Sequence, residues 1–424
     1  MNIEFLNGES VKLSDIPTVL EAPRKGEVTR TLASFKLFDG RFLTILGNAE
    51  THKLEAYAMT YGDEEAERYS TPASFLKGEA AHEVAVGPVH AGVIEPGHFR
   101  FQCMGEDVHS LAITLGYQTR GAEELIVKAH NDERRLAIAE TVAGDTSIAA
   151  RLAASKALNI PLSHSNSTLQ LLLELERIAN HVGDLGALSG DVAYLPTAAF
   201  CGRIRGEYLN MTAAYCGNRF GRGGAKRESA DIKEWFLRTK KELFHALDLL
   251  FSEEGAIDRF EHTGTVPKDV ASKIGLVGVA GRASGLTTDS RIDFPMEGET
   301  ITETLVSEKK MTGDVLSRAR QRYEELKISH ALVERLLETE STAVQPSTLS
   351  LQPSSITVAV VEAWRGELVH IAIRGENGEL VQYKIVDPSV HNWLGLAQAL
   401  RGEQISNFPI CNKSFNLSYC GVDK

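Results

Sequence analysis

The chain has 424 residues, of which 43% are hydrophobic and 24% are charged, as is typical of a soluble globular protein. Asp and Glu number 57 against 45 Lys and Arg, and the resulting net charge of −12 disfavours nucleic acid as a partner. The five cysteines include no CxxC pair, which disfavours a disulfide framework and a zinc ribbon.

The sequence also indicates in which part of the cell to expect the protein. Residues 1–17 lack the basic and apolar regions of a signal peptide. The longest stretch without charge, between Glu340 and Glu362, is rich in Ser, Thr, Gln and Pro and is unsuited to a transmembrane helix. We therefore expect a cytoplasmic protein that reaches a membrane only through partners.

Two segments near the N-terminus predict β-structure. Residues 31–47 contain two β-rich apolar runs joined at Asp39 and Gly40, which is a hairpin signature. From Val84 to His109 apolar and polar residues alternate around Gly-Pro and Pro-Gly turns, which predicts a short β meander.

Long amphipathic helices are predicted next. Residues 164–188 carry apolar side chains at spacings of three and four, with Ser165 or Ser167 as the N-cap. Residues 230–251 and 313–338 show the same pattern. Each of these two begins near an aspartate, Asp231 or Asp314, whose carboxylate can accept hydrogen bonds from free backbone N–H groups.

The C-terminal part returns to strands. Residues 356–386 predict a hairpin with its turn near residues 375–378. The fold class is therefore α+β, with a large helical core flanked by N- and C-terminal β elements. We expect two domains: residues 1–75 as a small α+β segment, and residues 76–424 as the main domain.

Single motifs are weak indicators of chemistry. The turn Gly221-Arg-Gly-Gly224 lacks the strand–helix frame and the Lys-Ser/Thr pair of a phosphate loop, so nucleotide binding is a minor alternative. His164, Glu176 and His181 do not form the HExxH zinc motif, and a structural helix face explains them better.

Seven sequence blocks, taken together, indicate a function better than any single motif does. They follow one another along the chain at residues 87–101, 115–126, 174–192, 275–291, 313–325, 361–370 and 387–402. They include "GPVHAGVIEPGHFRF", "ELERIANHVGDLGALSGDV" and "VEAWRGELVH". On these blocks the chain from Val84 to Lys424 resembles the large subunit of membrane-bound, energy-converting nickel–iron hydrogenases of the formate hydrogenlyase type. It is similar, more distantly, to the quinone-site core subunit of respiratory complex I (NADH-quinone oxidoreductase). Residues 1–75 resemble at most a shortened form of the small complex I-like module that is often fused upstream.

The hydrogenase resemblance implies four thiolate ligands, because soft sulfur stabilises nickel and iron and bridges them. Here the four ligand positions hold Ala143, Thr146, Ser418 and Gly421, and Cys420 falls between the last two. Ala and Gly offer no side-chain ligand, and neutral hydroxyls are poor substitutes for thiolates. We therefore expect no metal bound by this chain and no hydrogenase activity.

The complex I resemblance is also incomplete. Ile94 stands where the quinone-headgroup histidine belongs, and His90 matches a different histidine of that family. Asp191 matches the aspartate that partners the missing histidine. No tyrosine occurs between Tyr117 and Tyr194, where the headgroup tyrosine belongs. The usual proton donors to a quinone are thus absent.

Other positions match functional residues of these families. Glu95 matches a glutamate that passes protons away from the hydrogenase metal site, although an exposed turn carboxylate is an equal alternative. Arg120 matches an arginine beside the iron–sulfur cluster of the adjoining small subunit, where its charge would raise the cluster potential. Arg365 matches a position close to the same site, and an ordinary strand-edge ion pair explains it equally well.

The resemblance implies the core subunit of a membrane-associated redox complex without its own nickel–iron centre. It would receive electrons from, or couple to, a small subunit that carries a 4Fe–4S cluster, and it would dock on membrane subunits that move ions. It would lie peripheral to the inner face of the cell membrane. The alternative is an active oxidoreductase subunit that reduces a quinone or another small acceptor in the vacated cavity.

Overall fold

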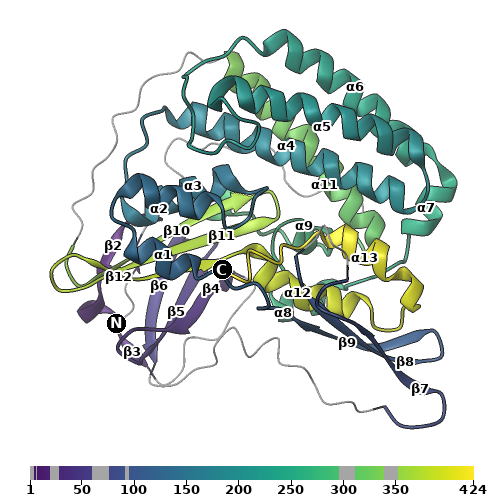
Figure 1. The fold of residues 1–424 in the computed structure, drawn as a ribbon, viewed down its shortest axis with the longest axis horizontal. Coiled ribbons are helices and arrows are strands. Elements are labelled where there is room, and N and C mark those ends of the chain that lie inside the picture. The colour runs from purple at the N-terminus through teal and green to yellow at the C-terminus, as the bar shows by residue number, and fades with distance from the viewer. Residues whose placement is uncertain are drawn as a thin grey trace.

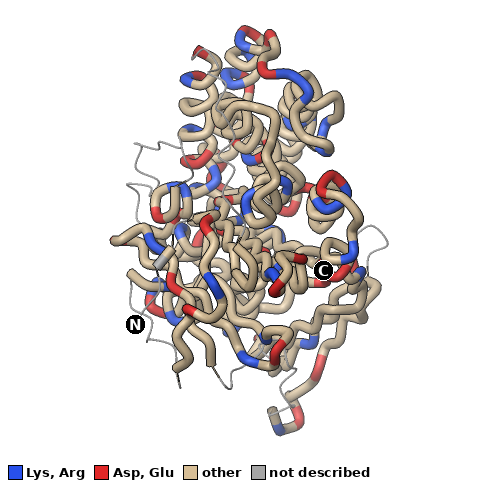
Figure 2. Tube along the Cα trace, turned by 90° about the vertical axis from the view of Figure 1, so that its left-hand side faces the viewer, with Lys and Arg blue, Asp and Glu red and all other residues tan. Residues whose placement is uncertain are grey.

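The structure of the chain is a computed structural model that describes residues 4–5, 7–19, 28–59, 76–90, 95–295, 311–338 and 352–424. Two sheets, a helical bundle and a separate small sheet are arranged as shown in Figure 1. In the described part of the chain, no helix combines the length and the apolar character needed to cross a membrane. Basic and acidic residues are interspersed along the chain in the view of Figure 2.

The predicted N-terminal hairpin is confirmed. Strands β4 (Thr29–Lys36) and β5 (Phe42–Asn48) pair antiparallel, and β6 (Lys53–Met59) continues the sheet. The turn between β4 and β5 places Gly40 at a φ of +88°, a left-handed conformation that glycine adopts without steric cost. Strands β1 (Glu4–Phe5) and β3 (Thr18–Val19) both pair with β6.

The predicted meander is also confirmed. It consists of β7 (Ala81–Val86), β8 (His98–Met104) and β9 (Asp107–Thr114), which pair antiparallel in order and project to the lower right in Figure 1.

The C-terminal hairpin prediction was wrong in one respect. The turn near residues 375–378 exists, but the segment forms three strands: β10 (Ser355–Ala363), β11 (Gly366–Arg374) and β12 (Leu380–Val386). A two-residue turn at Trp364 and Arg365 joins β10 to β11. The prediction missed this turn because Trp-Arg carries none of the Asn-Gly or Asp-Gly signals of a tight hairpin.

The C-terminal sheet is buried on both faces. Alternate residues such as Val358 and Ile371 pack against the N-terminal sheet, whereas Ala359 and Leu368 face the helical core. Strand β2 (Ser10–Lys12) adds to the edge of β10. The domain boundary predicted at residue 75 borders residues 60–75, which lie outside the described part, and it stays a prediction.

Four long helices form the bundle at the top of Figure 1: α4 (Asn166–Asp191), α5 (Leu195–Cys216), α6 (Lys233–Ser252) and α11 (Val315–Glu338). The predicted N-cap of α4 is confirmed, since Ser165 Oγ accepts a hydrogen bond from Thr168 N at 3.2 Å. Asp314 likewise accepts from Ser317 N at 2.7 Å at the start of α11.

The helix predicted over residues 230–251 is confirmed as α6, but its expected cap is absent and one further long helix was not predicted. Helix α6 begins after Ile232 without a side-chain cap, so Asp231 does not make the expected hydrogen bond. Helix α5 was not predicted, because it packs against both α4 and α6 and lacks a single apolar stripe.

Shorter helices cover the sheet and position its turns. Helices α1 (Ala122–Lys128) and α3 (Ser147–Leu158) pack against the C-terminal sheet, and α2 (Asp132–Glu140) packs against both of them. The other helices are α7 (Glu254–Phe260), α8 (Lys268–Ile274), α9 (Gly278–Ala283), α10 (Ser290–Asp293), α12 (Pro388–Ala399) and α13 (Phe408–Phe415), with 3-10 turns at Leu13–Asp15 and Ile405–Asn407. Helix α9 lies so close to the Trp364–Arg365 turn that a Cβ on Gly278 would lie 2.0 Å from Arg365 O.

Candidate functional site

The four predicted ligand positions lie on two loops. Ala143 and Thr146 are buried in the loop between α2 and α3, which we call the first loop (residues 141–146). Ser418 and Gly421 lie in the second loop (residues 416–421), which follows α13. Ser418 Oγ accepts a hydrogen bond from Gly421 N at 2.9 Å, so the second loop closes on itself.

Two arginines join these loops. Arg120 donates to the carbonyl oxygens of Thr141 at 3.1 Å and Val142 at 2.7 Å in the first loop. The same guanidinium reaches the carbonyl oxygen of Cys420 in the second loop at 3.5 Å. Arg120 therefore contacts both loops through backbone carbonyls.

Arg365 makes the second connection, from the turn between β10 and β11. Its Nη1 and Nη2 donate to the two carboxylate oxygens of Asp145 at 2.9 and 2.8 Å, and its Nε donates to Asn416 O at 2.6 Å. The guanidinium also stacks 3.9 Å from the Trp364 ring centre. Burial would raise the pKa of Asp145, but the Arg365 guanidinium outweighs it and lowers that pKa below its ordinary value.

The side chains at the ligand positions do not fit a nickel–iron centre. Thr146 Oγ1 accepts from Trp364 Nε1 at 3.2 Å and donates to Asp145 at 3.0 Å. A Cβ on Gly421 would lie 2.5 Å from the Asp387 carboxyl carbon. Burial raises the pKa of the neighbouring Cys420 thiol to about 12, which keeps it protonated. Within the described ranges, no group of three or more His, Cys, Asp or Glu side chains is placed to hold a metal ion.

The remaining predicted site residues are dispersed. Glu95 Oε2 accepts from Cys420 N at 2.9 Å, which places Glu95 against the second loop. His90 is exposed, and its Nδ1 lies 3.1 Å from Gly87 O. Asp191 ends α4 at the surface, and across the described residues no hydrogen bond joins it to a histidine. Ile94 lies outside the described residues.

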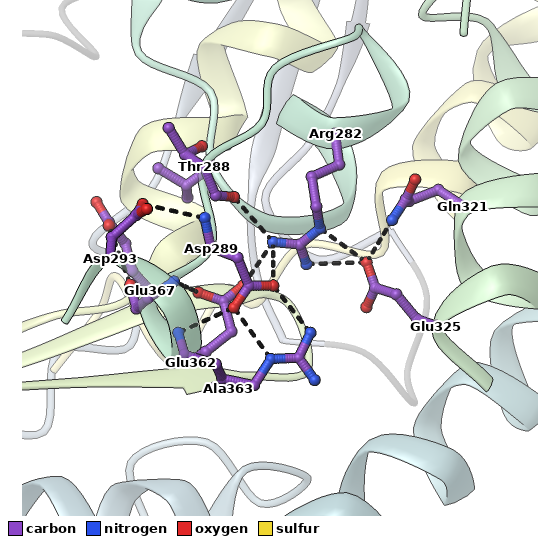
Figure 3. A network of polar contacts seen from close by, with 12 residues as sticks. Arg282, Thr288, Asp289, Asp293, Gln321, Glu325, Glu362, Ala363 and Glu367 are labelled. Carbon is purple, nitrogen blue, oxygen red and sulfur yellow. Dashed lines mark hydrogen bonds and ion pairs between the residues drawn. The ribbon is translucent and has the colours of Figure 1, made fainter. Parts of the chain in front are cut away.

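A buried network of charges lies behind the site, and sequence reasoning did not predict it. Its centre is Arg282, which is fully buried on α9 (Figure 3). Arg282 Nε donates to Glu325 Oε1 at 2.9 Å, and Nη1 lies 2.9 Å from both Glu362 Oε1 and Asp289 Oδ2. One guanidinium thus holds carboxylates from α11, from β10 and from the loop before α10.

The network extends in two directions. On one side, Glu325 Oε2 lies 2.9 Å from His181 Nε2 on α4. On the other, the Ser290 hydroxyl lies 3.4 Å from Glu367, which pairs at 2.8 Å with Arg30 on β4. Charged and polar groups therefore run from the bundle to the N-terminal sheet.

The network also fixes the turn that carries Arg365. Arg177 on α4 donates to the carbonyl oxygens of Glu362 at 2.6 Å and Ala363 at 3.0 Å, directly before that turn. Glu174, Arg177 and His181 are spaced three and four residues apart on α4, and all three are buried. This polar stripe on an apolar helix was the signal in the sequence that could have revealed the network.

Glu176 lies on α4, and its side chain reaches the first loop and the start of α3. Its carboxylate accepts hydrogen bonds from Ile148 N at 2.7 Å and Ala149 N at 3.3 Å, which caps α3. Together with Gly144 and Asp145 it lines a cavity of about 20 Å³, roughly the space of one water molecule. Burial raises the pKa of Glu176 to about 8 despite the two backbone donors.

The network should be necessary for stability. Replacing Arg282 with Met leaves Glu325 and Glu362 buried without their cation, and we expect it to lower the free energy of unfolding by about 3–5 kcal/mol. Lys128→Met removes an exposed ion pair with Glu124 and should leave the free energy of unfolding close to that of the wild type, because solvent screens this pair. Urea unfolding of both variants measures the difference. Equal losses would contradict a structural role of the network.

Glu176 should make stability depend on pH. The pKa of Glu176 in the folded state, about 8, lies above its ordinary value of 4.5. Between these two pH values the folded chain keeps a proton on Glu176 that the unfolded chain releases. The contribution of Glu176 to stability is therefore lost as pH rises from about 4.5 to about 8, at up to about 1.4 kcal/mol per pH unit.

Urea unfolding across this pH window should show a shallower decline for Glu176→Gln than for the wild type. The exposed substitution Glu254→Gln should leave the wild-type slope unchanged. A Glu176→Gln slope equal to that of the wild type would show that Glu176 is ionised throughout.

Comparison with known proteins agrees with this architecture. Residues 191–350 match the family described as "Respiratory-chain NADH dehydrogenase, 49 Kd subunit". The membrane-bound hydrogenase subunit alpha of Pyrococcus furiosus is 26% identical over 366 residues, which cover 79% of this chain and 85% of that protein. NADH-quinone oxidoreductase subunit 4 of Thermus thermophilus is 28% identical over 368 residues, with 76% and 88% covered.

Formate hydrogenlyase subunit 5 of Escherichia coli is 25% identical over 359 residues, or 80% of this chain, but this chain spans only 63% of that relative's length. A solved structure of the membrane-bound sulfane sulfur reductase, an archaeal respiratory membrane complex, contains a chain with the same fold. Its TM-score is 0.69 at 20% identity, and the match covers 82% of this chain and 100% of that one. The chain is therefore homologous to the large subunits of membrane-bound hydrogenases and to the corresponding core subunits of NADH-quinone oxidoreductases.

Proposed function

We propose that the chain is a core subunit of a membrane-associated redox complex, related to complex I and to energy-converting hydrogenases, and that it carries no nickel–iron centre of its own. The main support is the pair of loops at the former ligand positions. Arg120 and Arg365 join these loops through carbonyl and carboxylate oxygens, and no thiolate occupies any of the four positions.

The partner with the strongest support is a small subunit that carries a 4Fe–4S cluster. Arg120 is the residue that the family resemblance places beside this cluster, and it lies at the surface between the two loops. Its positive charge would stabilise the reduced cluster and so raise the cluster potential. Membrane subunits that move ions would complete the assembly and hold the chain at the inner face of the cell membrane.

Glu95 is the residue that we assign to proton movement at this site. It is half-buried, and its carboxylate holds the backbone N–H of Cys420 in the second loop. A carboxylate in contact with this loop is the kind of side chain that serves as a proton relay, which is the role that the family resemblance implies for Glu95.

The alternative function, reduction of a quinone or another small acceptor by this chain, has less support. Asp191 has no histidine hydrogen-bonded to it in the described part of the chain. No tyrosine occurs between Tyr117 and Tyr194 to donate a proton to a headgroup.

The proposal is tested by isolating the native complex through the full-length chain. We expect a 4Fe–4S protein and membrane proteins to co-purify, and we expect Arg120→Gln to lower the midpoint potential of the cluster, because a nearby positive charge is lost. Arg134→Gln, at an exposed position of α2, is the control and should leave the potential unchanged. A complex without an iron–sulfur protein, or an unchanged potential in Arg120→Gln, would contradict the proposal.

A further inference from the structure

A larger cavity lies next to the first loop and has no role in the function proposed above. It has a volume of about 210 Å³ and lies between α2, α3, the start of α4 and the glycine-rich turn at residues 221–224. Its apolar lining includes Leu136, Ile148, Leu152, Ile160, Leu162 and Leu172. Because an engineered apolar cavity of about 150 Å³ binds benzene, this space suffices for a molecule of one ring.

The glycine-rich turn forms one wall of the cavity, but it offers no phosphate site. Gly223 N donates to both carboxylate oxygens of Glu140 at 3.0 Å, and Gly224 N donates to Gly221 O at 3.0 Å. Arg222 N donates to Asn218 Oδ1 at 3.0 Å. These three backbone donors already have partners, so the turn does not present the run of free N–H groups that binds a phosphate.

The charges at the cavity are also paired. Arg151 lines the cavity and forms ion pairs with Glu140 at 2.7 Å and Glu133 at 3.1 Å. His164 Nδ1 lies 3.1 Å from Ser163 Oγ. An anionic ligand would compete with Glu140 and Glu133 for Arg151, and a cationic ligand would compete with Arg151 for the carboxylates. A neutral ligand would bind without competing for either the arginine or the carboxylates.

We propose that this cavity binds one small neutral molecule with a single ring and a mainly apolar surface. The ring would bury its surface against the leucine and isoleucine side chains, at roughly 25 cal/mol for each Å² of apolar area. Ile148 lines both this cavity and the water-sized cavity beside Gly144 and Asp145. A bound ring would therefore lie one side chain away from the first loop.

The test uses the full-length chain with toluene as the neutral probe and benzoate as its anionic counterpart, measured by ligand-observed NMR titration. We expect saturable toluene binding and at least roughly tenfold weaker binding of benzoate, because its carboxylate finds no free cation. Two variants fill the cavity from different elements: Leu169→Trp on α4 and Ala225→Phe after the glycine-rich turn. Leu237→Trp, on an exposed part of α6, is the matched control.

A cavity-filling variant that retains the wild-type circular dichroism should bind toluene at least roughly tenfold more weakly, and Leu237→Trp should bind it as the wild type does. Non-saturable toluene binding would overturn the proposal. So would benzoate binding as tight as that of toluene, or unchanged toluene binding in both filled variants. None of these outcomes depends on the metal content or partners of the complex.

Discussion

The structure depends on the buried contacts of Arg282 with three carboxylates. Burying one unpaired charge costs several kcal/mol, and an ion pair in the interior offsets this cost only when its hydrogen bonds are complete. Arg282 offsets its own burial and that of its partners by contacting Glu325, Glu362 and Asp289 at once. Because these carboxylates come from separate segments, the arginine fixes the bundle against the C-terminal sheet. Arg177 extends the same constraint to the turn that carries Arg365.

This constraint explains how the two loops keep their places without thiolates. In a nickel–iron site, the metals bind thiolates from both loops and so connect them. In this chain Arg120 and Arg365 make the connection, since a planar guanidinium has five donors and can contact several oxygens at fixed geometry. Arg365 itself is held by Asp145 and by the Trp364 ring. These contacts connect the two loops through side chains of the scaffold itself, and a site and its scaffold are separable in evolution.

Local features were predictable from the sequence, and long-range ones were not. The cap at Ser165 and the hairpin turn at Gly40 follow from a few neighbouring residues, and both are confirmed. The two loops were found only through the family resemblance, because residues 143 and 418 share no local pattern. The Arg282 network joins residues 43 and 80 positions apart, and no spacing rule relates such positions. The turn at Trp364 and Arg365 was missed because its glycine follows the turn instead of forming it.

We propose that the loops persist in a redox complex in which this chain binds no nickel. The most direct measurement is the nickel and iron content of the native complex, isolated through the full-length chain and analysed by mass spectrometry of its metals. We expect iron in the amount that a partner cluster requires and nickel far below one atom per chain. Nickel at one atom per chain would overturn this proposal, because Ala143 and Gly421 offer no side-chain ligand and the hydroxyls of Thr146 and Ser418 are poor nickel ligands.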